Sequence, residues 1–129
     1  MIKLTPLLFC CFLVHSMATA QDKVLEDIGV SLKNGSAREL IKFCADPLTI
    51  KLNNSSNSYA KAQAEGQLRR FFQDNPPSNF SYIHQGSSRE RLRYCIGKYS
   101  MRKNSYRVVL LIKQQGSDYL VEQITLTKE

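Results

Sequence analysis

From Phe80 onward the sequence alternates apolar and polar residues with a period of two, and no other feature constrains the fold as much. A β-strand places successive side chains on opposite faces, so this alternation predicts a sheet with a buried face. Three short polar segments interrupt the alternation and divide it into four strands, at residues 79–86, 92–101, 105–115 and 118–126. Because the connections are tight, we expect neighbouring strands to be antiparallel.

Two helices are predicted before this sheet. Asp22 can cap the first helix, in which apolar residues recur every three to four positions, and Asn34-Gly35 ends it. The second helix begins with Ser36 and Glu39, which have the spacing of a capping box. We expect it to end at Asp46-Pro47, because proline cannot continue a helix.

A strand, a loop and a third helix follow. Residues 48–52 alternate in the manner of a half-buried strand, and the Ser- and Asn-rich composition of residues 53–58 predicts a loop. Residues 61–74 are rich in good helix formers and are followed by Pro76-Pro77. Helices followed by a meander of strands are an α+β arrangement, with the helices packed on one face of a twisted sheet.

The N-terminus has the three parts of a signal peptide. Lys3 is followed by an apolar stretch at residues 7–14 and by Ala18-Thr19-Ala20. Cleavage after Ala20 would remove residues 1–20 and leave residues 21–129 as one domain, exported to the periplasm or outside the cell. The apolar stretch is shorter than the roughly 20 residues of a membrane-spanning helix. No later segment is long or apolar enough either, so we expect no transmembrane segment.

The chain is basic, with a formal net charge of +7 that becomes about +6 when Lys3 is removed. Seven of its cations form three groups on separate predicted elements, mostly near the ends of these elements, and acidic residues are interspersed. The groups are Arg69-Arg70, Arg89/Arg91/Arg93 and Arg102-Lys103. This distribution is typical of a solvated surface, and no nucleic-acid-binding module is present, so we expect no nucleic acid partner. Attraction to an anionic envelope surface or to an acidic glycan stays open.

Several motifs together resemble a bacterial exported family called domain of unknown function 4783, which is assigned to the nuclear-transport-factor-two-like superfamily. They span the mature chain in order and with matching spacing: Lys61-Ala62-Gln63-Ala64-Glu65, Phe71-Phe72, Asn75-Pro76-Pro77, His84-Gln85-Gly86-Ser87-Ser88, Tyr94, Ile96-Gly97 and Tyr106-Arg107-Val108. The resemblance implies a cone-shaped α+β domain, in which a strongly curved antiparallel sheet wraps against the helices and leaves a cavity at its open end.

The resemblance does not imply a reaction. The wider superfamily includes isomerases and dehydratases, but also binding and accessory domains without catalysis, so the fold does not fix the function. The family itself has no established activity. No residue is therefore carried over as catalytic.

Two titratable residues of the predicted sheet are candidates for a site. His84 shares its strand phase with Tyr82 and could act as a base near neutral pH, although a packed histidine is the simpler interpretation. Glu122 is in phase with Leu120 and Ile124, on a face that otherwise has core character. If that face lined the cavity, Glu122 could act as an acid or a base. An edge position near the mouth of the cone, paired with an arginine or lysine, is the simpler explanation.

These residues lead to three hypotheses of different classes. The leading one is a non-enzymatic binding or accessory domain, with a cavity for a small apolar or amphipathic ligand lined by Tyr82, His84, Tyr94 and Glu122. The second is a cofactor-free isomerase or dehydratase that uses Glu122 or His84 as the proton carrier. The third is a structural domain that forms a homodimer through an exposed sheet face.

Cysteines, metals and cofactors give few further signals. Cys44 and Cys95 remain after processing and could form a disulfide in an oxidising compartment, but their apolar neighbours favour two buried free thiols. One histidine and two cysteines do not form the cluster of three or four ligands that zinc requires, so we expect no metal. The sequence has no glycine-rich phosphate loop, nucleophile elbow or dinucleotide fingerprint, and we expect no cofactor.

Overall fold

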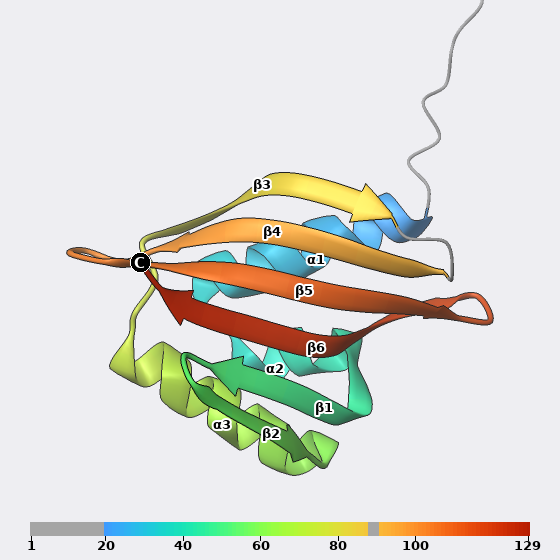
Figure 1. Cartoon of the computed structure of the whole chain (residues 1–129), viewed down its shortest axis with the longest axis horizontal. Coiled ribbons are helices and arrows are strands. Elements are labelled where there is room, and N and C mark those ends of the chain that lie inside the picture. Colours follow the sequence, from blue (N-terminus) through green and yellow to red (C-terminus); the bar gives the residue numbers. More distant parts are fainter. Residues whose placement is uncertain (1–19, 88–90) are drawn as a thin grey trace, which may run out of the picture.

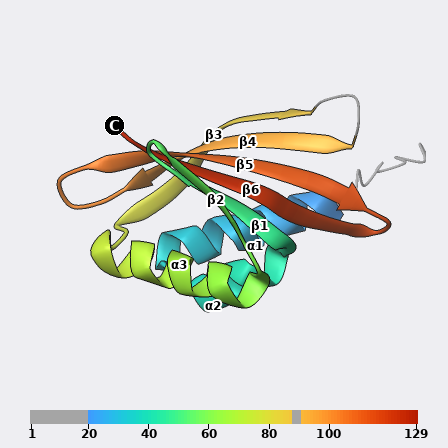
Figure 2. The same ribbon diagram turned by 60° about the horizontal axis from the view of Figure 1, so that its bottom comes forward.

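The computed structural model describes residues 20–87 and 91–129, so the predicted signal peptide lies outside the described residues except for its last position. Within these ranges, three helices cover one face of a six-stranded sheet (Figures 1 and 2). The elements in chain order are α1 (Ala20–Asn34), α2 (Ala37–Leu40), the 3-10 turn η1 (Ile41–Phe43), β1 (Cys44–Leu52), β2 (Ser55–Tyr59), α3 (Lys61–Asp74), β3 (Asn79–Ser87), β4 (Leu92–Ser100), β5 (Ser105–Gln115) and β6 (Asp118–Lys128).

The strand order of the sheet is β2-β1-β6-β5-β4-β3. All neighbours are antiparallel except β1 and β6, which are parallel. Consecutive strands joined by short turns must run in opposite directions. No short turn joins β1 and β6, so these two strands can run in the same direction. The predicted α+β class is confirmed, and this one parallel pair is an addition to the predicted antiparallel meander.

The sequence pattern located the C-terminal strands well. β3, β4, β5 and β6 begin at the residues where the alternation predicts them, and α3 has the predicted bounds. In each strand the alternation sends one set of side chains toward the helices and the other set away from them. We call these two sides of the sheet the inner face and the outer face. On β4 the inner set is Cys95, Gly97 and Tyr99, and the outer set is Tyr94, Ile96 and Lys98.

The region between α1 and α3 differs from the prediction. The second helix is one turn long and continues into η1, and β1 then begins at Cys44 and runs through Asp46 and Pro47. The side chain of Ser36 accepts a hydrogen bond from the Glu39 backbone N–H at 3.2 Å, as a capping box requires. The carboxylate of Glu39 instead accepts a bond from Lys42 at 3.1 Å. Only half of the capping box is therefore formed, since the Ser36 backbone N–H bonds to the Ser31 carbonyl at 2.9 Å and not to the Glu39 carboxylate.

The segment predicted as a loop contains the edge strand β2. It pairs with β1 from Ser55 to Tyr59. Four of its five residues are exposed and only Tyr59 is half-buried, so the strand has no alternating apolar side chains to reveal it. A strand at the edge of a sheet is set by backbone pairing with its neighbour, and composition alone does not show such pairing.

The core lies between the inner face and the helices. Leu25, Ile28 and Leu32 of α1 are buried in the same core as Val108 and Leu110 of β5, which are fully buried. Beneath the β4–β5 pair the space is filled by aromatic rings. Phe71 of α3 packs edge-on against Tyr106, with ring centroids 5.1 Å apart, and its ring lies 5.5 Å from that of Tyr99. This part of the predicted cone is therefore closed by the protein's own side chains.

Candidate functional site

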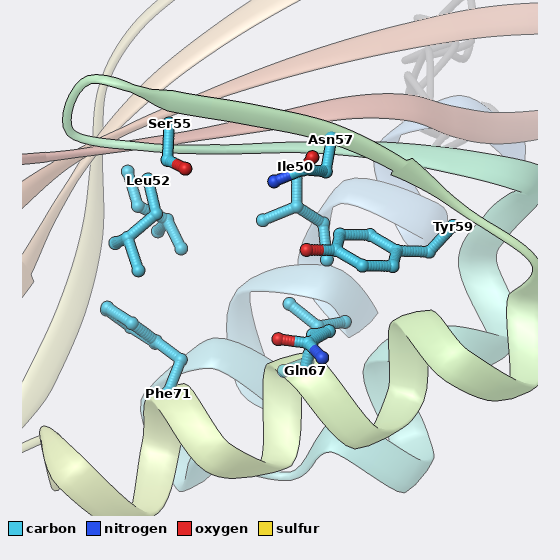
Figure 3. A pocket seen from close by; sticks show the side chains of 9 residues that line it. Ile50, Leu52, Ser55, Asn57, Tyr59, Gln67 and Phe71 are labelled. Carbon is cyan, nitrogen blue, oxygen red and sulfur yellow. The ribbon is translucent and has the colours of Figure 1, made fainter.

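A cleft of about 190 Å³ lies between the β1–β2 hairpin and α3 (Figure 3). It is bounded on one side by the sheet and on the other by the exposed flank of the helix. The residues that line it are Ile50, Leu52, Ser55, Asn57, Tyr59, Gln67, Leu68, Phe71 and Leu126.

Strand register and helix periodicity bring these side chains together. On β1, Ile50 and Leu52 belong to the inner set and therefore face α3. In the antiparallel hairpin, Asn57 lies directly opposite Ile50 and Ser55 directly opposite Leu52, so their side chains share the same face. Alternate residues of β2 thus complete a wall that β1 begins.

The helix α3 supplies the opposite wall. Gln67 and Phe71 are four residues apart and lie one above the other on the same side of the helix. In Figure 3 the polar ends of Asn57, Tyr59 and Gln67 come to the middle of the cleft, and Leu52 and Phe71 line its other part. The cleft therefore has an apolar part and a part with hydroxyl and amide groups.

The lining is chemically neutral. Of the nine described residues around the cleft, five are aliphatic or phenylalanine side chains, and the others carry hydroxyl or amide groups; none is an acid, a cation, a histidine or a cysteine. Such a surface offers apolar contact and a few hydrogen bonds. It does not offer a proton carrier that titrates near neutral pH.

The structure places Tyr82 under the sheet. It lies opposite Gly97 on the inner face, and its hydroxyl donates a hydrogen bond to the Leu25 carbonyl of α1 at 2.6 Å. Burial raises the pKa of Tyr82 above its ordinary value. Tyr82 also lines a shallow pocket with Asp22, Leu25, Glu26 and Gln85. Its main contact is with α1.

His84 lies on the outer face. The pairing of β3 with β4 has an irregularity between Tyr82 and His84, so that Ile83 is an extra residue and His84 lies opposite Ile96. Such a bulge moves the following residues to the other face. His84 is exposed as a result, and it is not part of the phase that the sequence predicted.

Tyr94 also belongs to the outer face, opposite Leu111 of β5. Its side chain is 44% exposed. Neither Tyr94 nor His84 lines the described cleft.

The predicted phase of Glu122 is corrected by a second bulge. The pairing of β6 with β5 shifts between Val121 and Gln123, and Glu122 has no partner in the register. Val121, not Leu120, takes the inner position and is fully buried, whereas Glu122 is half-buried at the bulge. A one-residue insertion reverses the phase of a strand, and a strict period of two cannot show it.

The four predicted site residues are therefore not brought together in one cavity. His84 and Glu122 lie on β3 and β6, which are separated by β4 and β5. Three strand spacings correspond to about 14 Å. The convergence that an acid–base pair of these two residues would require is not present.

Cys44 and Cys95 are both buried and are free thiols. Burial raises the pKa of Cys44 from its ordinary value of 9.0 to about 12, and burial also raises that of Cys95. Residues 20–87 and 91–129 contain no group of three or more His, Cys, Asp or Glu side chains that could hold a metal ion. In the same ranges, no helix has the length and apolar character needed to cross a membrane.

None of the cleft residues was a candidate from the sequence. Most of the β2 side of the cleft lies in a segment that the sequence predicted as a loop. One signal pointed to this place: Gln67 is polar and exposed, but it lies next to the buried stripe of α3 that is formed by Ala64, Leu68 and Phe71. A polar residue beside a core stripe is a weak indication of a site, and surface helices contain many such residues.

Comparison of the sequence with known protein families identifies the family of this chain. The sequence model of the family "Domain of unknown function (DUF4783)" matches residues 25–127. The chain belongs to this family. No curated protein matches the chain.

Solved structures of DUF4783 family proteins are similar over nearly the whole domain. One from Bacteroides ovatus ATCC 8483 is 28% identical, with a TM-score of 0.75 over 80% of this chain and 93% of that chain. Another, from Bacteroides uniformis ATCC 8492, is 27% identical, with a TM-score of 0.75 over 81% of this chain and 95% of that chain.

More distant structures share the fold alone. An NTF-2-like protein of unknown function from Burkholderia xenovorans LB400 is 10% identical, with a TM-score of 0.63 over 83% of this chain and 80% of that chain. A putative ketosteroid isomerase from Kribbella flavida DSM 17836 is 12% identical, with a TM-score of 0.58 over 83% and 76%. The nuclear-transport-factor-two-like architecture implied by the resemblance is thereby confirmed. A shared architecture does not imply a shared activity.

Proposed function

We propose that this DUF4783 protein is an exported, non-enzymatic binding domain whose cleft between β1–β2 and α3 holds a small apolar or amphipathic ligand. The observation that carries the proposal is the neutral lining of the cleft. An apolar wall with a few hydroxyl and amide groups is typical of a ligand site, in which the apolar contacts give affinity and the polar groups fix orientation.

The size of the cleft limits the ligand. Ligand pockets for drug-sized molecules are about 300–1,000 Å³, and a cavity of about 150 Å³ can hold benzene. A cleft of about 190 Å³ thus favours one ring or a short acyl chain. The hydroxyl of Tyr59 and the amides of Asn57 and Gln67 can bond a single polar group on that ligand.

Titration with p-cresol, indole and hexanol, followed by backbone NMR, tests the proposal. We expect saturable shifts confined to Ile50, Tyr59, Gln67 and Phe71. A phenylalanine at Ser55 would fill the mouth of the cleft, so Ser55→Phe should weaken binding at least about tenfold, which corresponds to 1.4 kcal/mol.

The matched control is Ser56→Phe. Ser56 lies beside Ser55 on the same strand but pairs with Lys51 on the outer face. This variant should bind with unchanged affinity. NMR shifts that do not saturate would remove the basis of the proposal. An equal loss of affinity in Ser55→Phe and Ser56→Phe would remove it as well.

Export is the second part of the proposal, and the signal-peptide pattern of residues 1–20 supports it. Mass spectrometry of the protein from a producing cell should show an N-terminus at Gln21. A mass that includes Met1 in the functional protein would contradict export.

A further inference from the structure

The outer face of the sheet carries an unusual set of side chains. This face lies toward the viewer in Figure 1, and the helices lie behind the sheet. Its charged residues at paired strand positions include Lys51 on β1, Lys98 on β4, and Arg107 and Lys113 on β5. These four are cations, and the carboxylate at a paired position of this face, Asp118, lies opposite Gln115 at the end of β6.

Carboxylates lie near this face at three places. Glu129 follows β6 and pairs with Arg107 at 3.8 Å. Asp118 is at the tip of the β5–β6 hairpin, and Glu122 occupies the bulge. Among the described residues, Lys51, Lys98 and Lys113 take part in no ion pair. Their positive charge is therefore available to a partner.

The cationic surface continues into a hollow at the β4–β5 turn. This hollow has a volume of about 350 Å³ and is lined by Lys98, Ser100, Met101, Arg102, Lys103, Asn104, Ser105 and Glu129. Three cations and three hydroxyl or amide side chains surround it, against one carboxylate. An anionic group can receive both charge and hydrogen bonds there.

The other half of the outer face is rich in hydroxyl and amide groups. At its paired positions on β1, β2 and β6 lie Thr49, Ser56, Ser58, Gln123, Thr125 and Thr127. These groups offer donors and acceptors to a hydroxylated partner. They are poorly suited to insertion among acyl chains, because an unsatisfied polar group in an apolar medium costs free energy.

A second copy of this chain is a poor fit for the surface. A two-fold interface places the same patch of both subunits face to face. The cations outnumber the carboxylates on this face, and Asp118, the carboxylate at a paired position, lies at the far end of β6 from Arg107, so cations of one copy would meet cations of the other. Like charges in such an interface oppose association.

We propose that the outer face binds a linear acidic polysaccharide, with uronate or sulfate groups at Lys98, Lys113 and the β4–β5 hollow, and sugar hydroxyls at the threonines and serines. Charge complementarity carries the argument, and the hydroxyl-rich half distinguishes a glycan from other polyanions. Single-stranded nucleic acid favours several aromatic stacking platforms, whereas Tyr94 is the one exposed tyrosine at a paired position of this described face. The proposal is independent of the cleft, which lies on the inner side.

Binding of the processed chain to oligogalacturonate, measured by calorimetry at low salt and at about 0.15 M salt, tests the proposal, with neutral dextran as the reference. We expect binding to oligogalacturonate that weakens with salt, and no binding to dextran. The triple variant Lys51→Gln/Lys98→Gln/Lys113→Gln should lose at least about tenfold in affinity, because three rim charges are removed.

A triple variant on the helices is the matched control. Lys33→Gln/Arg38→Gln/Arg70→Gln removes the same charge from exposed positions of α1, α2 and α3, and it should bind within about twofold of the parent. Equal losses in the two triple variants would mean that net charge alone drives binding, and would overturn the proposal.

Two further arms distinguish the partners. Thr49→Val/Thr125→Val removes hydroxyls without a change in charge, and it should weaken binding of oligogalacturonate severalfold while leaving binding of a charge-matched single-stranded DNA unchanged. Absence of that difference would favour a general polyanion site and overturn the glycan. Binding to anionic phospholipid vesicles but not to oligogalacturonate would overturn it as well.

Discussion

At the scale of single residues, Gly97 shows how closely the inner face is packed. It lies on β4 opposite Tyr82, and the Phe80 ring covers it. A Cβ atom at this position would lie 2.5 Å from Phe80 Cε2 and 3.1 Å from the Ser81 carbonyl oxygen. Glycine is therefore required by the approach of a neighbouring ring, and an aromatic side chain over a strand glycine compensates for its missing side chain.

The first prediction is that Gly97→Ala lowers the free energy of unfolding by about 1–3 kcal/mol, since an added methyl group forces the ring to move. Urea unfolding measures the change. Gly66→Ala is the control: nothing lies within 4 Å of a Cβ at that helical position, and alanine should stabilise α3 by about 0.5–1 kcal/mol. A Gly97→Ala protein as stable as its parent would mean that Phe80 does not pack there.

At the scale of elements, the N-terminus of α3 is held by a residue from another strand. Ala60 precedes the helix and has no side chain that can accept a hydrogen bond. Asp46 of β1 supplies the acceptor, because its Oδ1 receives a bond from the Lys61 backbone N–H at 3.1 Å. This contact joins α3 to the hairpin and so fixes both walls of the cleft.

The second prediction follows from that contact. Asp46→Ala should lower the free energy of unfolding by about 1 kcal/mol, as the loss of a helix cap usually does. Asp46→Asn keeps an acceptor oxygen and should lose less. Thermal or urea unfolding of both variants measures the difference, and identical losses would indicate that the charge of Asp46, and not its hydrogen bond, is what matters.

Elements also show where sequence-based prediction succeeds and where it stops. The strands from Phe80 onward were predicted because their alternation reflects burial on one face, which depends on each residue alone. The bulges at Ile83 and Glu122 depend on pairing with the next strand, and they moved His84 to the outer face and Glu122 out of the inner phase. β2 depends on pairing too, so the cleft that it forms was not predicted.

At the scale of the whole molecule, the core holds titratable groups that it keeps neutral. Burial raises the pKa values of Cys44, Cys95, Tyr82 and Tyr99 above their ordinary values. The hydroxyl of Tyr99 donates to the Asn75 carbonyl, and the Cys44 thiol donates to the Leu40 carbonyl at 3.4 Å. Each of these groups binds its proton more tightly in the folded protein than in the unfolded chain.

The third prediction concerns the stability of the fold at alkaline pH. Below pH 9 the Cys44 thiol is protonated in both the folded and the unfolded states. In this range the thiol therefore adds no pH dependence to the free energy of unfolding. Above the ordinary pKa of 9.0 the unfolded chain loses this proton, whereas the folded protein keeps it up to about pH 12. The free energy of unfolding should therefore fall across this window, by up to about 1.4 kcal/mol per pH unit for this one group.

The variant Cys44→Ser isolates that contribution, because serine does not titrate in this range and its hydroxyl can donate to the same Leu40 carbonyl. Urea unfolding at a series of pH values from 7 to 11 should give a shallower decline for Cys44→Ser than for the parent, with parallel curves below pH 9. Lysines and exposed tyrosines affect both proteins alike, so the difference between the two curves reports the thiol. Parallel curves over the whole range would show that Cys44 titrates as it does in the unfolded chain, and that the junction of η1 and β1 is open to water.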